Sequence, residues 1–180
     1  MPIKTRELPP TEYLNTVFRA DFEAGKLYWK EREDRSSKFN KRYAGKEAGS
    51  FDKHQGYLNV VVDGVKTRVH RVLLAMHYGE CPTSMQADHI NGDRTDNSIS
   101  NLRLVTQEQN NKNRTISRKN KTGIPGVWYN KARGRYEVTV GGKNKDYGQR
   151  KRFKDFFDAC CYRKSLEVAE GYHENHGRCQ

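Results

Sequence analysis

The segment 85–114 limits the fold of this chain more than any other, because it sets short apolar runs between turn-forming residues. Residues 86–90 are predicted to form a strand, and the Asn-Gly-Asp sequence that follows is typical of a turn. Residues 102–105 predict a second strand, with partly alternating apolar positions. A Thr-x-x-Gln capping box at 106–109 then predicts the start of a helix. The segment is therefore expected to form a strand–loop–strand–helix unit.

Four polar residues stand out in this unit: Asp88, His89, Asn101 and Asn110. Carboxylate and amide oxygens are ligands that a hard cation accepts, and histidine titrates close to neutral pH. Together these groups can make a small hydrolytic metal site. The plainer interpretation is that Asp88 belongs to an ordinary turn and that His89 ends a strand. A calcium-binding loop is excluded, because the twelfth residue from Asp88 is Ile99 rather than a bidentate acid.

These four positions and the apolar residues around them resemble the signature of the HNH (ββα-metal, or His-Me finger) nucleases, in the variety found in phage and intron-encoded homing endonucleases. The resemblance covers roughly residues 69–114. It implies that Asp88 and the last Asn hold one divalent metal ion, that His89 is the general base, and that Asn101 orients the loop of the histidine. The preceding His70 fits the same pattern. It either approaches the substrate phosphate or makes a structural hydrogen bond, and we favour the structural role.

The resemblance makes Asn110 the last metal ligand, at a position where other branches of the family carry His. The choice among Asn110, Asn111 and Asn113 stays open. Two oxygen ligands from the protein leave coordination positions for water and phosphate oxygens, which favours Mg²⁺, with Mn²⁺ as the alternative. No small-molecule cofactor is expected.

The charge of the chain indicates a polyanionic partner. Its 34 Lys and Arg exceed its 22 Asp and Glu, for a net charge of +12. Residues 1–113 carry 18 basic and 15 acidic residues, whereas residues 114–180 carry 16 and 7, so the basic excess lies in the last third. The charge therefore predicts a polyanionic partner, and the resemblance to the homing endonucleases implies that this partner is double-stranded DNA.

Other sequence features indicate a reducing compartment and no membrane partner. The four cysteines lack a Cys-x-x-Cys spacing, so a zinc site is not expected and reduced thiols are. No apolar run reaches the length of a membrane span. The predicted location is the cytoplasm, and the resemblance to phage homing endonucleases implies that of a phage-infected bacterial host. The oligomeric state stays open.

The chain before this unit is predicted to be rich in strands. A short helix is expected within 11–24, because Leu14, Val17 and Phe18 have helical spacing. We predict a strand at 26–30, a charged loop over 31–46, and a hairpin of strands 57–62 and 65–69 around Asp-Gly. A helix is expected over 70–78.

The last third is predicted to form a separate module after a basic linker, 114–123. Strands are expected at 126–129, 135–140 and 147–153, followed by a helix that Asp155 caps. The apolar stripe of that helix is predicted to be Ala159, Tyr162, Leu166 and Ala169. Three strands and one helix, with Gly-Val-Trp at 126–128, Arg-Tyr at 135–136, and Gly148 before Phe153, resemble the AP2-type DNA-binding domain. In that family the exposed face of the sheet enters the major groove.

Basic residues of this predicted sheet are candidates for DNA contact, since Arg can read guanine edges and Lys mostly contacts phosphate. The alternative is a solvated basic face. We assign Trp128 to the core. The predicted DNA-binding residues are Arg133, Arg135, Thr139, Lys143 and Lys145.

The sequence thus predicts an α+β chain: an N-terminal ββα-metal (His-Me finger) nuclease domain (1–113), a linker (114–123), and an AP2-like domain of three antiparallel strands and a helix (124–180). The predicted function is a metal-dependent DNA endonuclease that hydrolyses phosphodiester bonds, of the phage homing or nicking kind. The alternatives are a non-catalytic DNA-binding regulator, or a nonspecific or RNA-directed nuclease.

Overall fold

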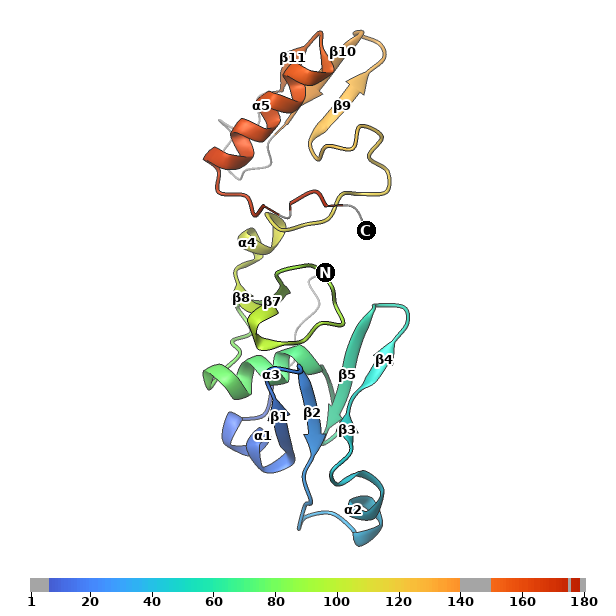
Figure 1. Cartoon of the computed structure of the whole chain (residues 1–180), viewed down its shortest axis with the longest axis vertical. Coiled ribbons are helices and arrows are strands. Elements are labelled where there is room, and N and C mark those ends of the chain that lie inside the picture. The colour runs from blue at the N-terminus through green and yellow to red at the C-terminus, as the bar shows by residue number, and fades with distance from the viewer. Residues whose placement is uncertain (1–6, 140–149, 175, 179–180) are drawn as a thin grey trace. The chain divides into compact units, whose positions relative to one another are not determined.

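The computed structural model describes residues 7–139, 150–174 and 176–178. The chain divides into two compact units, Met1–Gln107 and Glu108–Gln180. Each unit combines helices with small antiparallel sheets (Figure 1), so the α+β prediction is confirmed at this level. Within the described ranges, no helix combines the length and apolarity needed to cross a membrane.

Helix α3 (Val69–Tyr78) forms the centre of unit 1. Its apolar positions repeat at helical spacing, and Val72, Leu73 and Leu74 are fully buried. It packs against α1 (Thr11–Val17) and against strands of all three sheets of the unit. The helix ends at Gly79, whose φ of 87° is a left-handed conformation that glycine adopts without steric cost.

Two of the sheets lie N-terminal to α3 in sequence, and both are antiparallel. The first has the order β1-β2-β3, with β1 (Phe18–Asp21), β2 (Lys26–Trp29) and β3 (Glu47–Ala48). The second has the order β4-β5-β6, with β4 (Ser50–Asp52), β5 (Tyr57–Val62) and β6 (Val65–Arg68). Asp63 and Gly64 join β5 to β6 with positive φ angles of 46° and 80°, which confirms the predicted hairpin.

Two predictions about the N-terminal segment were incomplete. The helix expected within 11–24 ends at Val17, because Phe18 continues into β1 and is buried there by pairing opposite Trp29. The charged segment 31–46 contains a helix, α2 (Ser37–Tyr43), where a loop was predicted. Ser36 caps α2 by accepting a hydrogen bond from the Phe39 backbone N–H at 3.2 Å.

The strand–loop–strand–helix prediction for 85–114 is confirmed. Strands β7 (Gln86–His89) and β8 (Leu102–Val105) pair antiparallel. A short 3₁₀ helix, η1 (Ile99–Asn101), leads into β8, and α4 (Gln107–Asn111) follows it.

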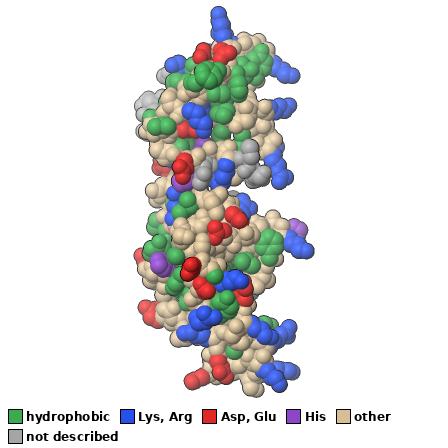
Figure 2. Space-filling view, viewed as in Figure 1, with side chains coloured by type: hydrophobic (Ala, Val, Ile, Leu, Met, Phe, Trp, Pro, Cys, Tyr) green, Lys and Arg blue, Asp and Glu red, His purple; other side chains and the backbone are tan. Residues whose placement is uncertain are grey.

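In the described part of unit 2, a three-stranded sheet is covered on one side by a helix. The sheet has the order β11-β10-β9. Its elements are β9 (Val127–Asn130), β10 (Arg135–Val138), β11 (Lys151–Phe153) and α5 (Phe156–Ala169). Asp155 caps α5 as predicted, accepting from the Asp158 N–H at 3.1 Å. The core between sheet and helix is built on Val127, Val138 and Ala159. Lys and Arg side chains project from the surface of this unit (Figure 2).

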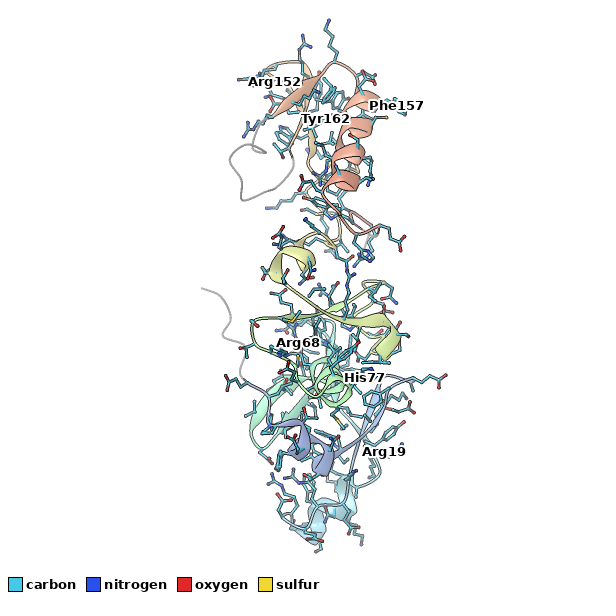
Figure 3. The ribbon with its side chains drawn as sticks, turned by 90° about the vertical axis from the view of Figure 1, so that its left-hand side faces the viewer. Arg19, Arg68, His77, Arg152, Phe157 and Tyr162 are labelled. Atoms are coloured by element: carbon cyan, nitrogen blue, oxygen red, sulfur yellow. The ribbon has the colours of Figure 1, made fainter. Side chains whose placement is uncertain are left out.

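The assignment of Trp128 to the core was wrong. Trp128 pairs with Glu137 across β9 and β10, whereas the next pair, Val127 and Val138, faces the helix. Because successive strand residues point to opposite faces, Trp128 lies on the face away from α5. Figure 3 shows Arg152, another residue paired with Glu137, on that side, and Tyr162 between sheet and helix.

The buried stripe of α5 also differs from the prediction. Ala159 is buried and Tyr162 packs against the core, but Ala169 is exposed. The stripe instead includes Arg163 and Glu167, which form a buried ion pair at 2.9 Å. Such a charged pair is tolerated in a core because each group satisfies the other. Hydrophobicity alone does not predict it.

Residues 114–123, predicted to be a linker, lie inside unit 2. The backbone N–H of Ile116 donates to the carbonyl of Arg178 at 3.0 Å, and that of Gly177 donates to the carbonyl of Arg114 at 2.9 Å. The segment is therefore hydrogen-bonded to the chain that follows α5. The division into functional domains stays a prediction.

Gly25, in the β1–β2 turn, gives a test of how unit 1 is packed. Its φ is +67°, and a Cβ there would lie 2.3 Å from the carbonyl carbon of Asn97. Gly25→Ala should lower the free energy of unfolding by about 2–4 kcal/mol, from overpacking added to left-handed strain. Gly45, at φ +75° with no atom within 4 Å of such a Cβ, is the control. Gly45→Ala should cost about 1–2 kcal/mol. If denaturant unfolding showed that both variants lose the same free energy of unfolding, the close packing at Gly25 would be contradicted.

Candidate functional site

Asp88 and His89 are the last two residues of β7, opposite Arg103 and Leu102 of β8. Pairing with β8 holds the backbone of both residues, while adjacent strand side chains point to opposite faces. The side chains of Asp88 and His89 therefore lie on opposite faces of the β7–β8 pair. Asp88 is half-buried on a side shared with Arg103, whereas His89 is only 5% exposed and packs inward.

Asn101 closes the loop that follows His89. Its side-chain Oδ1 accepts from the Asn91 backbone N–H at 2.9 Å, and its Nδ2 donates to the Asp96 carbonyl at 2.8 Å. Asn91 Nδ2 also donates to Asp96 Oδ2 at 2.9 Å. One amide therefore binds the backbone at both ends of the segment 91–96, a geometry suited to the loop-orienting role expected for Asn101.

The loop is further braced by its own acids. Asp93 Oδ1 accepts from the backbone N–H and hydroxyl of Thr95, and Asp96 Oδ1 accepts from those of Ser98. These hydrogen bonds hold the pKa of Asp93 and of Asp96 below the usual value, with the Thr95 and Ser98 hydroxyls as the largest causes. The side chains thus supply local partners for the polar backbone of a chain segment without regular structure.

His89 sits in a small aromatic cluster. Its ring centroid is 4.8 Å from that of His70, nearly perpendicular at 84°, and 6.0 Å from that of Tyr57. Burial lowers its pKa below 6.5, opposed by the hydrogen bond with Asn97 and the charge of Asp88. Burial likewise holds the pKa of His70 well below the ordinary value. Both imidazoles are therefore neutral at pH 7, and a neutral His89 is able to accept a proton.

Asn97 was not singled out in the sequence. It is 2% exposed, and its Oδ1 lies 3.0 Å from His89 Nε2. With the amide oxygen as acceptor, Nε2 carries the proton and the basic lone pair belongs to Nδ1. Asn97 Nδ2 is buried and has no hydrogen-bond partner among the described residues. A buried polar atom in this condition, beside the expected base, is a feature that functional sites tolerate and ordinary cores avoid.

Asp88 is held by Arg103 across the strand pair. Arg103 Nε and Nη2 both donate to Asp88 Oδ2, at 3.1 and 2.9 Å, and the carboxylate is 11% exposed. An ionised carboxylate near the surface fits a hard divalent cation. Arg103 competes with such an ion for Oδ2, so loading a metal requires the two cations to share or exchange this oxygen.

The three candidate Asn ligands are in unit 2. Asn110 and Asn111 belong to α4, and Asn113 follows it. Asn113 is 3% exposed, and its Oδ1 accepts from Arg178 Nη1 at 2.9 Å. A side-chain oxygen buried against a guanidinium is a poor cation ligand, which argues against Asn113 and leaves Asn110 and Asn111.

The outer face of the unit 2 sheet carries a different cluster. Glu137 is 1% exposed and forms ion pairs of 3.4–3.8 Å with three arginines. These are Arg133, Arg150 and Arg152. Arg150 also lies over the Trp128 ring at 5.6 Å. One buried carboxylate therefore gathers three exposed guanidinium groups, and the face keeps a net positive charge.

The predicted DNA-binding residues fall in several places. Arg133 belongs to this cluster, and Arg135 lies on the same sheet face, half-buried. The carbonyl of Thr139 accepts from Arg163 Nη1 at 3.1 Å, an interaction within the unit. Lys143 and Lys145 lie outside the described residues. Arg150 and Arg152, which the sequence analysis did not name as candidates, also pair with Glu137 in this cluster.

Three comparisons with known proteins bear on this site. Residues 67–112 match the family model of the HNH endonucleases, and this segment lies within the range over which the sequence resembles that family. Protein 3.8 of Escherichia phage T7 is 30% identical over 74 residues, which are 41% of this chain. The match spans 61% of the length of that relative. A solved structure on DNA binding and cleavage by the HNH homing endonuclease I-HmuI matches with a TM-score of 0.43 and 19% identity, over 96% of this chain and 97% of that one. The AP2 resemblance stays a prediction.

The buried histidines predict a pH dependence of stability in metal-free buffer. His70 has a lowered pKa in the folded state and an ordinary pKa near 6.5 when unfolded, so the unfolded state binds more protons below that value. Stability is therefore complete above about pH 6.5 and falls as the pH drops, by about 1.4 kcal/mol per pH unit for each such histidine. The free energy of unfolding, measured with denaturant between pH 5 and 7, should depend less steeply on pH in His70→Phe than in wild type. The difference should correspond to the uptake of one proton. His77→Phe, at an exposed position of the same helix, is the matched control. An unchanged slope in His70→Phe would contradict the burial.

Proposed function

We propose that this chain is a metal-dependent DNA endonuclease that hydrolyses phosphodiester bonds, of the phage homing or nicking kind. One observation carries the proposal: Asp88 and His89 are adjacent at the end of β7, and Asn101 holds the loop behind them. All three lie within the segment that matches the HNH endonuclease family.

His89 is the general base in this proposal. A phosphodiester is cleaved when water attacks phosphorus, and the attacking water must lose a proton. Burial keeps His89 neutral, and the contact with Asn97 leaves the lone pair on Nδ1 to accept that proton. Asn101 does not touch the substrate and acts as a positioning residue, because its bonds end on the loop backbone.

Asp88 and Asn110 would hold one divalent cation, most suitably Mg²⁺, with Mn²⁺ as the alternative. When bound, the cation supplies charge neutralisation at the phosphate and stabilises the leaving oxygen. Arg103 orients Asp88 through its two hydrogen bonds before any metal binds. Asn110 is preferred to Asn113, whose amide oxygen is already bound by Arg178.

Unit 2 is the DNA-anchoring part of the proposal. Its sheet presents the guanidinium groups of Arg133, Arg150 and Arg152 around a single buried carboxylate. Such a face attracts duplex DNA through its phosphates. Arg133 and Arg135 are the candidates for contact with the bases. This arrangement is the reason to retain the AP2-like interpretation of the module.

The alternative functions differ in which nucleic acid is cut and in whether it is cut at all. One active site per chain nicks one strand, so a double-strand break requires two chains or two events. A non-catalytic regulator with this scaffold would bind DNA without cutting it. A nonspecific or RNA-directed nuclease would cut RNA as well as duplex DNA.

Cleavage of supercoiled plasmid tests the proposal. Wild-type chain with Mg²⁺ should convert the plasmid to open circles, and EDTA should abolish the conversion. His89→Ala should slow it by about 10²–10⁴, the range expected for loss of a general base. His54→Ala, at an exposed turn, is the matched control and should cut at the wild-type rate.

Plasmid conversion at the same rate by wild type and His89→Ala would refute the catalytic assignment. DNA binding without metal-dependent conversion would favour the regulator. Asp88→Asn and Asn110→Ala should each raise the Mg²⁺ concentration needed for half-maximal conversion, whereas Asn113→Ala should not.

Salt dependence of binding tests unit 2 as the anchor. The slope of log affinity against log salt should shrink by about 0.9 for every phosphate that a variant no longer neutralises. Arg150→Gln with Arg152→Gln should therefore flatten the slope by up to about 1.8 in fluorescence anisotropy on a labelled duplex. Lys164→Gln removes a charge from α5, where Lys164 pairs with Glu167, and should leave the slope unchanged. Equal slopes in all variants would contradict anchoring by the sheet.

A further inference from the structure

Tyr57, the first residue of β5, connects the histidine cluster of unit 1 to two arginines. Its ring centroid is 6.0 Å from that of His89 and 5.4 Å from that of His70. The Cζ atom of Arg68 lies 4.0 Å from the same ring centroid, and that of Arg94 lies 4.9 Å away. Three separate segments, β5, the end of β6 and the loop after β7, thus bring two guanidinium groups to one ring.

Neither guanidinium group forms an ion pair with a carboxylate of the described residues. Arg94 Nη1 donates to the backbone carbonyl of Gln55 at 2.9 Å, which is a neutral partner. Across the described residues, no carboxylate lies within ion-pair distance of Arg68 or Arg94, whereas Arg103 pairs with Asp88. The two charges are within about 9 Å of each other through the shared ring, and at this separation they repel by about 0.5 kcal/mol even in water. Stacking on Tyr57 holds them together despite that repulsion.

The pair is also close to the expected base. Both guanidinium groups are within about 11 Å of the His89 ring, as the distances through Tyr57 require. A strand of duplex DNA carries one phosphate about every 3.4 Å along the helix axis. A phosphodiester group at His89 would therefore have neighbouring phosphates within reach of both arginines. Half-buried Arg68 and exposed Arg94 can each present N–H donors to such an oxygen.

We propose that Arg68 and Arg94, positioned by Tyr57, bind backbone phosphates of duplex DNA that flank the bond to be cut. This inference rests on the proposed function and deepens it, since it assigns the substrate-binding groups of unit 1. The contacts carry no sequence information, because phosphates are alike, and they set the register of the duplex at His89. Arginine suits this role better than lysine because its planar fork stacks on the ring and still donates to phosphate.

Binding of the full chain to a labelled duplex, in EDTA so that no cutting occurs, tests the proposal. Arg68→Gln and Arg94→Gln should each reduce the slope of log affinity against log salt by about 0.9, and the double variant by about 1.8. Arg68→Lys keeps the charge and should keep the slope. Arg19→Gln is the matched control: Arg19 is exposed and stacks on Tyr28 at 4.3 Å, but lies on β1, apart from Arg68 in Figure 3.

The Arg19→Gln slope should equal that of wild type. Wild-type slopes in Arg68→Gln and Arg94→Gln would overturn the inference, as would equal losses in Arg19→Gln, which would indicate a general charge effect. A lower slope in Arg68→Lys matching that of Arg68→Gln would also overturn it, because it would indicate damage to the fold rather than removal of a charge.

The two experiments distinguish failure of this inference from failure of the proposed function. If the wild-type chain fails to nick plasmid but the arginine variants show a smaller salt slope, the nuclease assignment fails and the phosphate site stands. If the chain nicks plasmid through His89 and the slopes are unchanged, the nuclease stands and this phosphate site is refuted.

Discussion

The two hydrogen bonds of the Asn101 side chain hold together the site on which this account depends. They bind the backbone of Asn91 and of Asp96, so the loop after His89 is closed by one amide rather than by regular structure. With that loop in place, Asn97 reaches His89 from inside it. The β1–β2 turn supports the same segment from outside, where Ile99 N–H donates to the carbonyl of Phe22 at 2.8 Å.

Burial and charge are combined differently in the two units. Unit 1 buries His70 and His89, which lowers the pKa of both, and places Arg68 and Arg94 beside that cluster. Unit 2 buries a carboxylate, Glu137, in its outer sheet face and surrounds it with arginines. An isolated buried carboxylate is costly, so the arginines stabilise Glu137 while it holds them in place. Both units therefore present fixed guanidinium groups, which lose less side-chain entropy on binding phosphate than mobile ones.

The features that were predicted correctly from the sequence are those set by local patterns of turn residues and hydrophobic spacing. The hairpin at Asp63-Gly64, the stripe of α3 and the β7–β8 pair follow from turn residues and periodicity within a few positions. The signature at 88–110 located the candidate site because its residue types are unusual together. Asn101 bonds to the backbone of Asn91 and Asp96, and its role in orienting the loop of His89 stays a prediction.

Contacts between distant segments were not predictable in the same way. Phe18 joins β1 because β2 lies beside it, although its spacing to Leu14 is helical. Trp128 faces outward because the register with β10 pairs it with Glu137. No motif in the sequence links Tyr57, Asn97 and Arg68. They could be recognised as neighbours of the His89 site only from the structure, where β5, β6 and the loop after β7 meet.

Anomalous diffraction from crystals of the chain bound to duplex DNA and soaked in Mn²⁺ tests the central claim most directly. The account predicts one strong anomalous peak, with oxygens of Asp88 and Asn110 at about 2.1–2.2 Å and a DNA phosphate beside His89. A peak held by other residues, or a duplex whose phosphates stay away from His89, would contradict it.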